Sequence, residues 1–287
     1  MSQNISTGIR LTAIASLLAA VALAAGCGGG GGEAGATQLS GSTTTAASAV
    51  PSGAAFACDF SSGWQQCGFM EQAKVTGQRA TIVSIGGVNA VRLHTEPGDN
   101  NVTGSGDHER NDLTTSQATT DGYEGSEHWW AHSVLFPDDY VDPPQSELGG
   151  TWHAGLVFDF HNTTDGGAVQ ANFQVQAMPV TAIDPGRPTG LSFQVAYGNP
   201  SSPTKQTFPI GPVVRNVWYN FKYHVRWASD GTGFFKAWVN DVPYMDYKGP
   251  TLYSGQGVYV KLANYHSPYG QPSSVIHARV IRSNTPL

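Results

Sequence analysis

The chain has 287 residues, of which 40% are hydrophobic and only 13% are charged, with 35 Gly and 17 Pro. That share of Gly and Pro is too low for a collagen-like or largely disordered chain, and the charge is too sparse for a coiled coil. The 15 basic and 21 acidic residues give a net charge of −6, which argues against a general nucleic-acid-binding protein. A charge-poor chain rich in Gly and aromatic residues is typical of an all-β extracellular protein.

Residues 1–26 have the features of an export signal. Arg10 precedes an apolar run from Leu11 to Ala25, which suits a signal-peptide core and is shorter than the roughly 20 residues of a membrane-spanning helix. Small residues directly before Cys27 resemble a bacterial lipobox, in which the cysteine is lipidated. We therefore expect an exported bacterial outer-membrane lipoprotein, periplasmic or at the cell surface, with its only membrane contact through Cys27. The alternative is ordinary secretion.

Residues 27–55 are dominated by Gly, Ala, Ser and Thr, a composition that forms a flexible tether rather than a packed core. Residues 56–287 are then left for one large domain. Cys58 and Cys67 are nine positions apart in an exported chain, so we expect a disulfide between them. A pair of free buried thiols is the alternative.

Short runs rich in β-branched and aromatic residues follow one another through this domain, separated by turn signals. They are 81–85, 90–94, 127–136, 151–161, 169–177, 191–197, 217–227, 233–239, 258–265 and 275–282. No segment keeps a helical period over three turns. The pattern predicts an all-β fold, a concanavalin-like jelly-roll sandwich of two antiparallel sheets with a concave groove.

Alternation along three of these strands separates a core face from a polar face. In 151–161, Leu156, Phe158 and Phe160 belong to the core face. The polar faces carry His153, Asp159 and His161 in that strand, His224 and Arg226 in 217–227, and Tyr259, Lys261 and Tyr265 in 258–265. Faces that combine aromatic, cationic and histidine side chains suit a groove for an acidic sugar chain. A local cationic cleft is thus compatible with the negative net charge.

Three segments carry a family resemblance: 108–113 has the sequence HERNDL, 158–161 has FDFH and 259–266 has YVKLANYH. In this order they resemble the Arg-x-Glu-Leu, Gln-x-His and Tyr-Phe-Lys-x-Gly-x-Tyr-Asn-Gln motifs of the jelly-roll polysaccharide lyases. That group includes glucuronan lyases, alginate lyases and the heparin lyase I-like enzymes. The chain departs from the motifs at four positions, with Asp112 for Glu, Asp159 for Gln, Ala263 for Gly and His266 for Asn.

The resemblance implies a lyase whose partner is an acidic polysaccharide. Such an enzyme cleaves uronic-acid chains by β-elimination and requires no cofactor. This reaction needs a neutralised carboxylate, a base for the C5 proton and an acid for the leaving oxygen. The resemblance gives these tasks to Arg110, His161 and Tyr265. The predicted substrate contacts are Lys261, Asp159, Tyr259, His153, His108, His224, Arg226 and His266. An ionised Asp159 would repel a uronate, so it must be protonated, ion-paired or serve another purpose.

Other functions remain open on the sequence. A non-catalytic, lectin-like domain of the same fold is one alternative, and Arg110 beside Asp112 also fits a plain ion pair. A glycoside hydrolase needs two carboxylates about 5–9.5 Å apart, and no typical carboxylate motif is present. No nucleotide, haem or zinc motif occurs, whereas the loop oxygens of Asp99 and Asp107 allow a structural calcium ion. We expect a monomer without nucleic-acid partners.

Overall fold

The computed structural model describes residues 50–103, 108–143, 155–163, 170–179 and 189–287. The predicted export signal, Cys27 and nearly all of the predicted tether lie outside these residues. So do Asp107 and His153. Within the described ranges, no helix is both long enough and apolar enough to cross a membrane.

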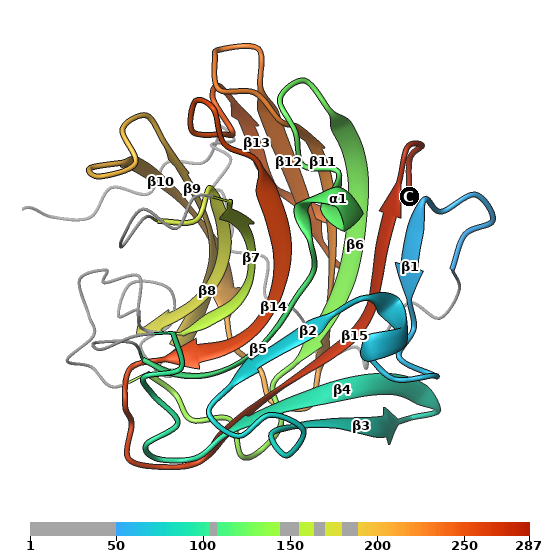
Figure 1. The fold of residues 1–287 in the computed structure, drawn as a ribbon, viewed down its shortest axis with the longest axis vertical. Coiled ribbons are helices and arrows are strands. Elements are labelled where there is room, and N and C mark those ends of the chain that lie inside the picture. The colour runs from blue at the N-terminus through green and yellow to red at the C-terminus, as the bar shows by residue number, and fades with distance from the viewer. Residues whose placement is uncertain (1–49, 104–107, 144–154, 164–169, 180–188) are drawn as a thin grey trace, which may run out of the picture. The chain divides into compact units, whose positions relative to one another are not determined.

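Two antiparallel sheets make up the domain (Figure 1), which confirms the predicted jelly-roll sandwich. The eight-stranded sheet has the order β13-β12-β11-β6-β15-β4-β3, with β1 paired to β15. Its strands are β1 (Phe56–Cys58), β3 (Ala80–Ile85), β4 (Val88–Thr95), β6 (Glu127–Leu135), β11 (Trp218–Arg226), β12 (Phe234–Val239), β13 (Val242–Lys248) and β15 (Ser273–Ser283).

The seven-stranded sheet has the order β10-β9-β8-β7-β14-β5-β2. Its strands are β2 (Met70–Ala73), β5 (Glu109–Thr114), β7 (Leu156–Asn162), β8 (Phe173–Pro179), β9 (Thr189–Tyr197), β10 (Thr204–Pro212) and β14 (Val258–His266). The short helix α1 (Gln117–Thr120) and the 3-10 turn η1 (Gln65–Cys67) complete the described elements. In Figure 1 this sheet is strongly curved, and its free side is the concave one.

Aromatic side chains fill the space between the two sheets. Phe158 and Phe160 of β7 contact Tyr223 of β11, with ring centroids 5.7 and 6.1 Å apart. Phe173 of β8 stacks on Phe235 of β12 at 3.9 Å. Burial of each such ring stabilises the fold by roughly 2–3 kcal/mol, so these contacts fix which face of β7 points inward. The intervening residues of β7 must then point to the free face.

An irregularity in β7 changes the face predicted for one residue. Leu156 pairs with Tyr265 of β14 and with Gln176 of β8, and the register shifts against both neighbours between Leu156 and Phe158. Leu156 therefore leaves the core face and packs with Ala263 and Tyr265.

The predicted disulfide between Cys58 and Cys67 is confirmed, with Cα atoms 5.5 Å apart. It links β1, which pairs with β15, to η1. The bridge thus fastens the start of the described domain to the eight-stranded sheet.

Candidate active site

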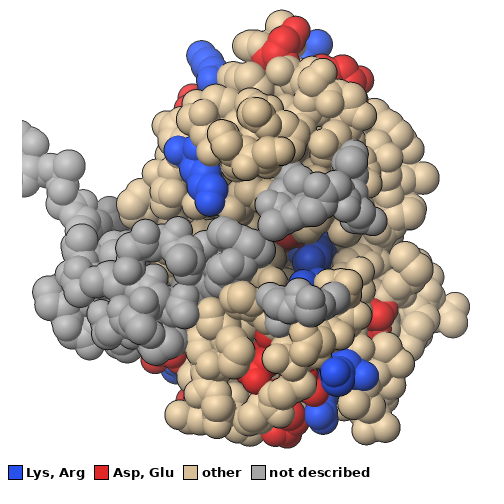
Figure 2. Space-filling model, turned by 60° about the vertical axis from the view of Figure 1, so that its left-hand side comes forward, with Lys and Arg blue, Asp and Glu red and all other residues tan. Residues whose placement is uncertain are grey.

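The three motif segments lie side by side as β5, β14 and β7, the central strands of the seven-stranded sheet. β14 is in the middle, and its register pairs Tyr265 with Arg110 and Lys261 with Asp159. Figure 2, in which the concave side of Figure 1 comes forward, shows Lys or Arg atoms recessed in a hollow. Residues more than 100 positions apart in the sequence thus meet on one free face of the sheet.

One end of this site is built around the Tyr265 ring. The Arg110 guanidinium carbon lies 4.4 Å from the centre of that ring, and the His108 ring centre lies 5.6 Å from it. Arg110 also contacts Asp112 at 3.4 Å, so the ion pair considered as an alternative exists beside the aromatic contact. Arg110 is buried, and these neighbours hold its permanent positive charge in place.

Two acidic residues lie in the middle of the site. Lys261 Nζ is 3.5 Å from Asp112 Oδ2, the same oxygen that Arg110 contacts. Asp112 and Asp159 are fully buried, and among the described residues neither carboxyl group accepts a hydrogen bond. Burial raises the pKa of Asp159 to about 7, with the Lys261 charge acting in the opposite direction and the Asp112 charge adding to the rise.

His161 is held as a neutral imidazole with one defined tautomer. Its Nδ1 lies 2.9 Å from the Asn162 carbonyl oxygen, which only accepts, so Nδ1 carries the proton. Burial and then the Lys261 charge lower the pKa of His161 to about 3. Its Nε2 therefore carries a lone pair at neutral pH, as a base requires.

The expected pair of His161 and Tyr265 is not brought together. His161 pairs in register with Tyr259, and their rings stack 5.1 Å apart. Tyr259 and Tyr265 are six positions apart on β14, which corresponds to about 20 Å of strand. Among the described residues, the histidine whose ring lies against Tyr265 is His108, which stands two residues before Arg110 and so shares its face.

A row of amides, buried on β8 and β9 and half-buried on β2, extends the same face and was missed at the sequence level. Gln174 of β8 pairs in register with Asp159 and with Gln194 of β9, and Gln176 is its neighbour on the same face. Gln72 of β2 lies opposite Asp112 on the other side. The available signal was the period-two spacing of the amides Gln170, Asn172, Gln174 and Gln176, since amides on a buried strand face need polar partners.

The structure corrects three predicted substrate contacts. His224 and Arg226 belong to β11 of the eight-stranded sheet, where both contact Glu127, at 2.8 and 4.0 Å. Alternation assigns a residue to a face of its strand but does not identify the sheet, which explains the error. His266 follows Tyr265 and therefore points between the sheets, where it is buried and its Nε2 lies 2.9 Å from Thr95 Oγ1.

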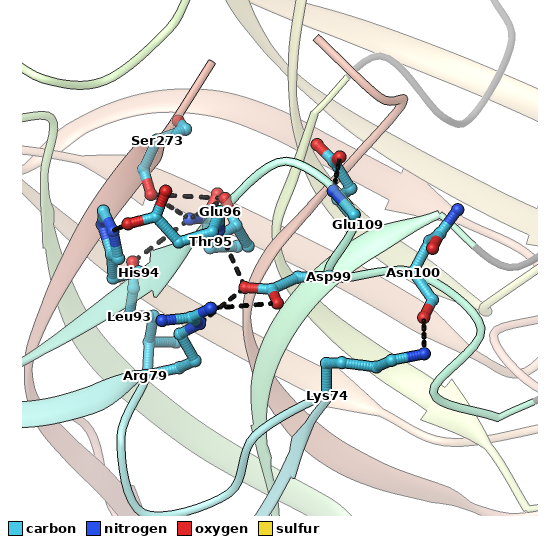
Figure 3. A network of polar contacts seen from close by, with 12 residues as sticks. Lys74, Arg79, Leu93, His94, Thr95, Glu96, Asp99, Asn100, Glu109 and Ser273 are labelled. Carbon is cyan, nitrogen blue, oxygen red and sulfur yellow. Dashed lines mark hydrogen bonds and ion pairs between the residues drawn. The ribbon is translucent and has the colours of Figure 1, made fainter. Parts of the chain in front are cut away.

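The predicted calcium ligand Asp99 has a different role (Figure 3). Its carboxylate accepts two hydrogen bonds from Arg79, at 2.7 and 3.2 Å, and one from the Glu96 backbone N–H at 2.8 Å. Its carbonyl oxygen accepts from the Arg110 N–H at 3.0 Å. This network positions the start of β5 and hence Arg110. The described residues contain no group of three or more His, Cys, Asp or Glu side chains arranged to hold a metal ion.

Comparison with known proteins adds a family match. The model of the family described as polysaccharide lyase matches residues 59–279. The solved endo-β-1,4-glucuronan lyase of the fungus Trichoderma reesei has a TM-score of 0.55 at 14% identity, covering 75% of this chain and 95% of that one. Alginate lyase A1-II′, of polysaccharide lyase family 7, has a TM-score of 0.49 at 15% identity, covering 74% and 86%. No curated protein matches the chain.

Proposed function

Because the chain belongs to the polysaccharide lyase family, we propose that it cleaves a uronic-acid-containing polysaccharide by β-elimination. The observation that carries the proposal is the placement of Arg110 and Tyr265 in direct contact on the free face of the central strands. Arg110 supplies a charge for a carboxylate, and Tyr265 supplies a hydroxyl for proton transfer. The glucuronan lyase of the same fold supports a uronate polymer as the substrate class.

The first task of the site is to bind the carboxylate next to the bond that breaks. Removal of the C5 proton places negative charge on this group, so a fixed cation lowers the barrier. Arg110 suits the task because its guanidinium stays charged and can donate two hydrogen bonds to a carboxylate. Lys261, which contacts the same Asp112 oxygen as Arg110, adds a second positive charge within the site.

The second task is a pair of proton transfers. A base removes the C5 proton, the electron pair forms the C4–C5 double bond, and the C4–O bond breaks as its oxygen takes up a proton. Tyr265 protonates the leaving oxygen, and His108 beside it takes the C5 proton. We assign His161 to substrate binding next to this centre, because the register separates it from Tyr265. The contact between His108 and Tyr265 supports this choice of His108 as the base in place of His161.

The test compares Tyr265→Phe, His108→Asn and His161→Asn by the ultraviolet absorbance of the unsaturated product, with glucuronan and alginate as substrates. Tyr265→Phe and His108→Asn should each lower kcat by about 100-fold or more, the usual contribution of a proton-transfer group. His161→Asn should mainly raise KM. His224→Asn, on the other sheet, is the matched control and should keep full activity.

Two results would change these assignments. A large loss of kcat in His161→Asn with little loss in His108→Asn would return the role of base to His161. Binding of acidic polymers by the wild-type protein with no unsaturated product from any of them would refute the lyase reaction. Such a result would favour a lectin-like sugar-binding domain.

A further inference from the structure

Asp159 is a buried carboxyl group that has no ion-pair partner within the described part of the chain. It is 0% exposed, and neither of its oxygens has a hydrogen-bond donor among the described residues. Lys261, its register partner on β14, contacts Asp112 instead, and so does Arg110. A buried carboxylate in this situation is strongly disfavoured and takes up a proton.

The charges that face Asp159 come from β14, which pairs with β7, and from β5, the next strand in the sheet. β14 contributes Lys261, and β5 contributes Arg110 and Asp112. His161, two positions away on β7, is neutral, and Gln174 lies opposite on β8. The Gln174 Oε1 atom accepts a hydrogen bond from Gln176 at 2.6 Å, so this amide is oriented by its own strand.

The summed charge of four side chains, those of Arg110, Lys261, Asp112 and Asp159, depends on one proton. Arg110 and Lys261 carry two positive charges, and Asp112 carries one negative charge. When Asp159 is ionised, the four side chains sum to zero and a substrate carboxylate would lie beside a like charge. When Asp159 is protonated, one positive charge is in excess and its O–H is a hydrogen-bond donor. Only the protonated arrangement is complementary to a uronate.

Building on the proposed function, we propose that Asp159 binds the substrate carboxylate as a protonated acid, so that a uronate enters this site together with one proton. The Asp159 O–H donates to one carboxylate oxygen of the sugar, while Arg110 binds the same carboxylate. Asp159 is then a specificity-determining residue that makes recognition of uronates strongest at acidic to neutral pH. Above neutral pH, binding requires uptake of a proton from solvent.

Proton counting by calorimetry tests this directly. The Tyr265→Phe variant is titrated at pH 8 with oligosaccharides of glucuronate, guluronate and mannuronate, in two buffers with different ionisation enthalpies. We expect close to one proton taken up per oligosaccharide bound. The double variant with Asp159→Asn, whose amide donates without titrating, should take up none. Equal proton counts in the two variants, or binding without uptake in the first, would overturn the role of Asp159.

A kinetic measurement separates this inference from the proposed reaction. For the wild-type enzyme, KM should rise about tenfold per pH unit above pH 7, as expected for one linked proton. The KM of Asp159→Asn should stay nearly constant over the same pH range. If Asp159→Asn folds poorly, Asp159→Gln, with its longer amide side chain, serves as the second variant and should behave in the same way. Proton uptake without cleavage of any polymer would refute the lyase reaction and leave Asp159 in its role. Cleavage with a KM that rises equally with pH in the wild type and the variants would refute the role of Asp159 and leave the lyase reaction in place.

Discussion

At the scale of single residues, Asp159 couples the stability of the fold to pH. Its pKa is about 7 in the folded protein and roughly 3.9 in an unfolded chain. Between these values the folded state holds the extra proton, so stability falls as the pH rises through this window. The slope from this one group is at most about 1.4 kcal/mol per pH unit.

Asp159→Asn should therefore raise the melting temperature at pH 8 and change it little at pH 4. Thermal unfolding at both pH values measures the effect, because the amide removes the cost of a buried charge. Asp246→Asn, at an exposed position, is the control and should shift neither value. An equal shift of the Asp159→Asn variant at both pH values would show that the carboxyl group stays ionised or stays protonated throughout.

The sequence predicted a common face for the candidate site residues where a motif combined with strand alternation. Arg110, Lys261 and Tyr265 share a face because the residues between them alternate regularly across β5 and β14. The distance between His161 and Tyr265 could not be predicted from alternation, because they lie on different strands. The register between such strands is set by tertiary contacts and bulges. His224 and Arg226 contact Glu127 of the neighbouring strand β6. Alternation within one strand does not reveal which strand lies next to it, so this contact could not be predicted.

At the scale of elements, β5 shows why one central strand was not predicted. Its sequence, Glu109–Thr114, is mostly polar, yet every residue in it is buried. One face carries Arg110 and Asp112 into the site, and on the other Glu109 accepts a hydrogen bond from the Gly98 N–H at 2.7 Å. A strand buried among polar partners has no hydrophobic alternation, so only the motif resemblance marked it.

The disulfide between β1 and η1 should stabilise the domain without affecting the site. Closing a ten-residue loop is worth about 2.7 kcal/mol by the chain-entropy relation. Replacing Cys58 and Cys67 together by Ser should lower the free energy of unfolding in urea by roughly that amount. Because β1 pairs with β15 in the eight-stranded sheet, kcat and KM of the double variant should stay at wild-type values. A large loss of activity at unchanged folding would contradict this separation.

At the scale of the whole molecule, the net charge of −6 gives no indication of the site. Acidic residues outside the site are largely paired with nearby cations, as in Arg79–Asp99, Arg92–Asp139 and Lys222–Asp241. The recessed Lys and Arg atoms in Figure 2 lie on the concave side instead. Total charge therefore excludes broad electrostatic binding, and it does not reveal the cationic side chains that lie together on the concave side.

Buried histidines give the whole domain a sensitivity to acid. His132, His266 and His277 are buried, and burial lowers the pKa of each, to about 4 for His266 and His277. Their folded pKa values lie below the ordinary value near 6.5, so the unfolded chain binds more protons as the pH falls. The stability that depends on neutral imidazoles is present above pH 6.5 and is lost progressively below it.

The free energy of unfolding should thus decrease from pH 6.5 to pH 4, by at most about 1.4 kcal/mol per pH unit for each of these histidines. This trend exceeds the opposite slope from the single Asp159, so maximal stability lies near neutral pH. Urea unfolding at several pH values measures it in the wild type and in His277→Gln, whose amide can still donate to the Ala263 carbonyl oxygen that His277 Nε2 contacts at 3.1 Å. The variant should lose part of the slope because one titrating group is gone. An unchanged slope would mean that His277 binds its proton equally in the folded and unfolded chains.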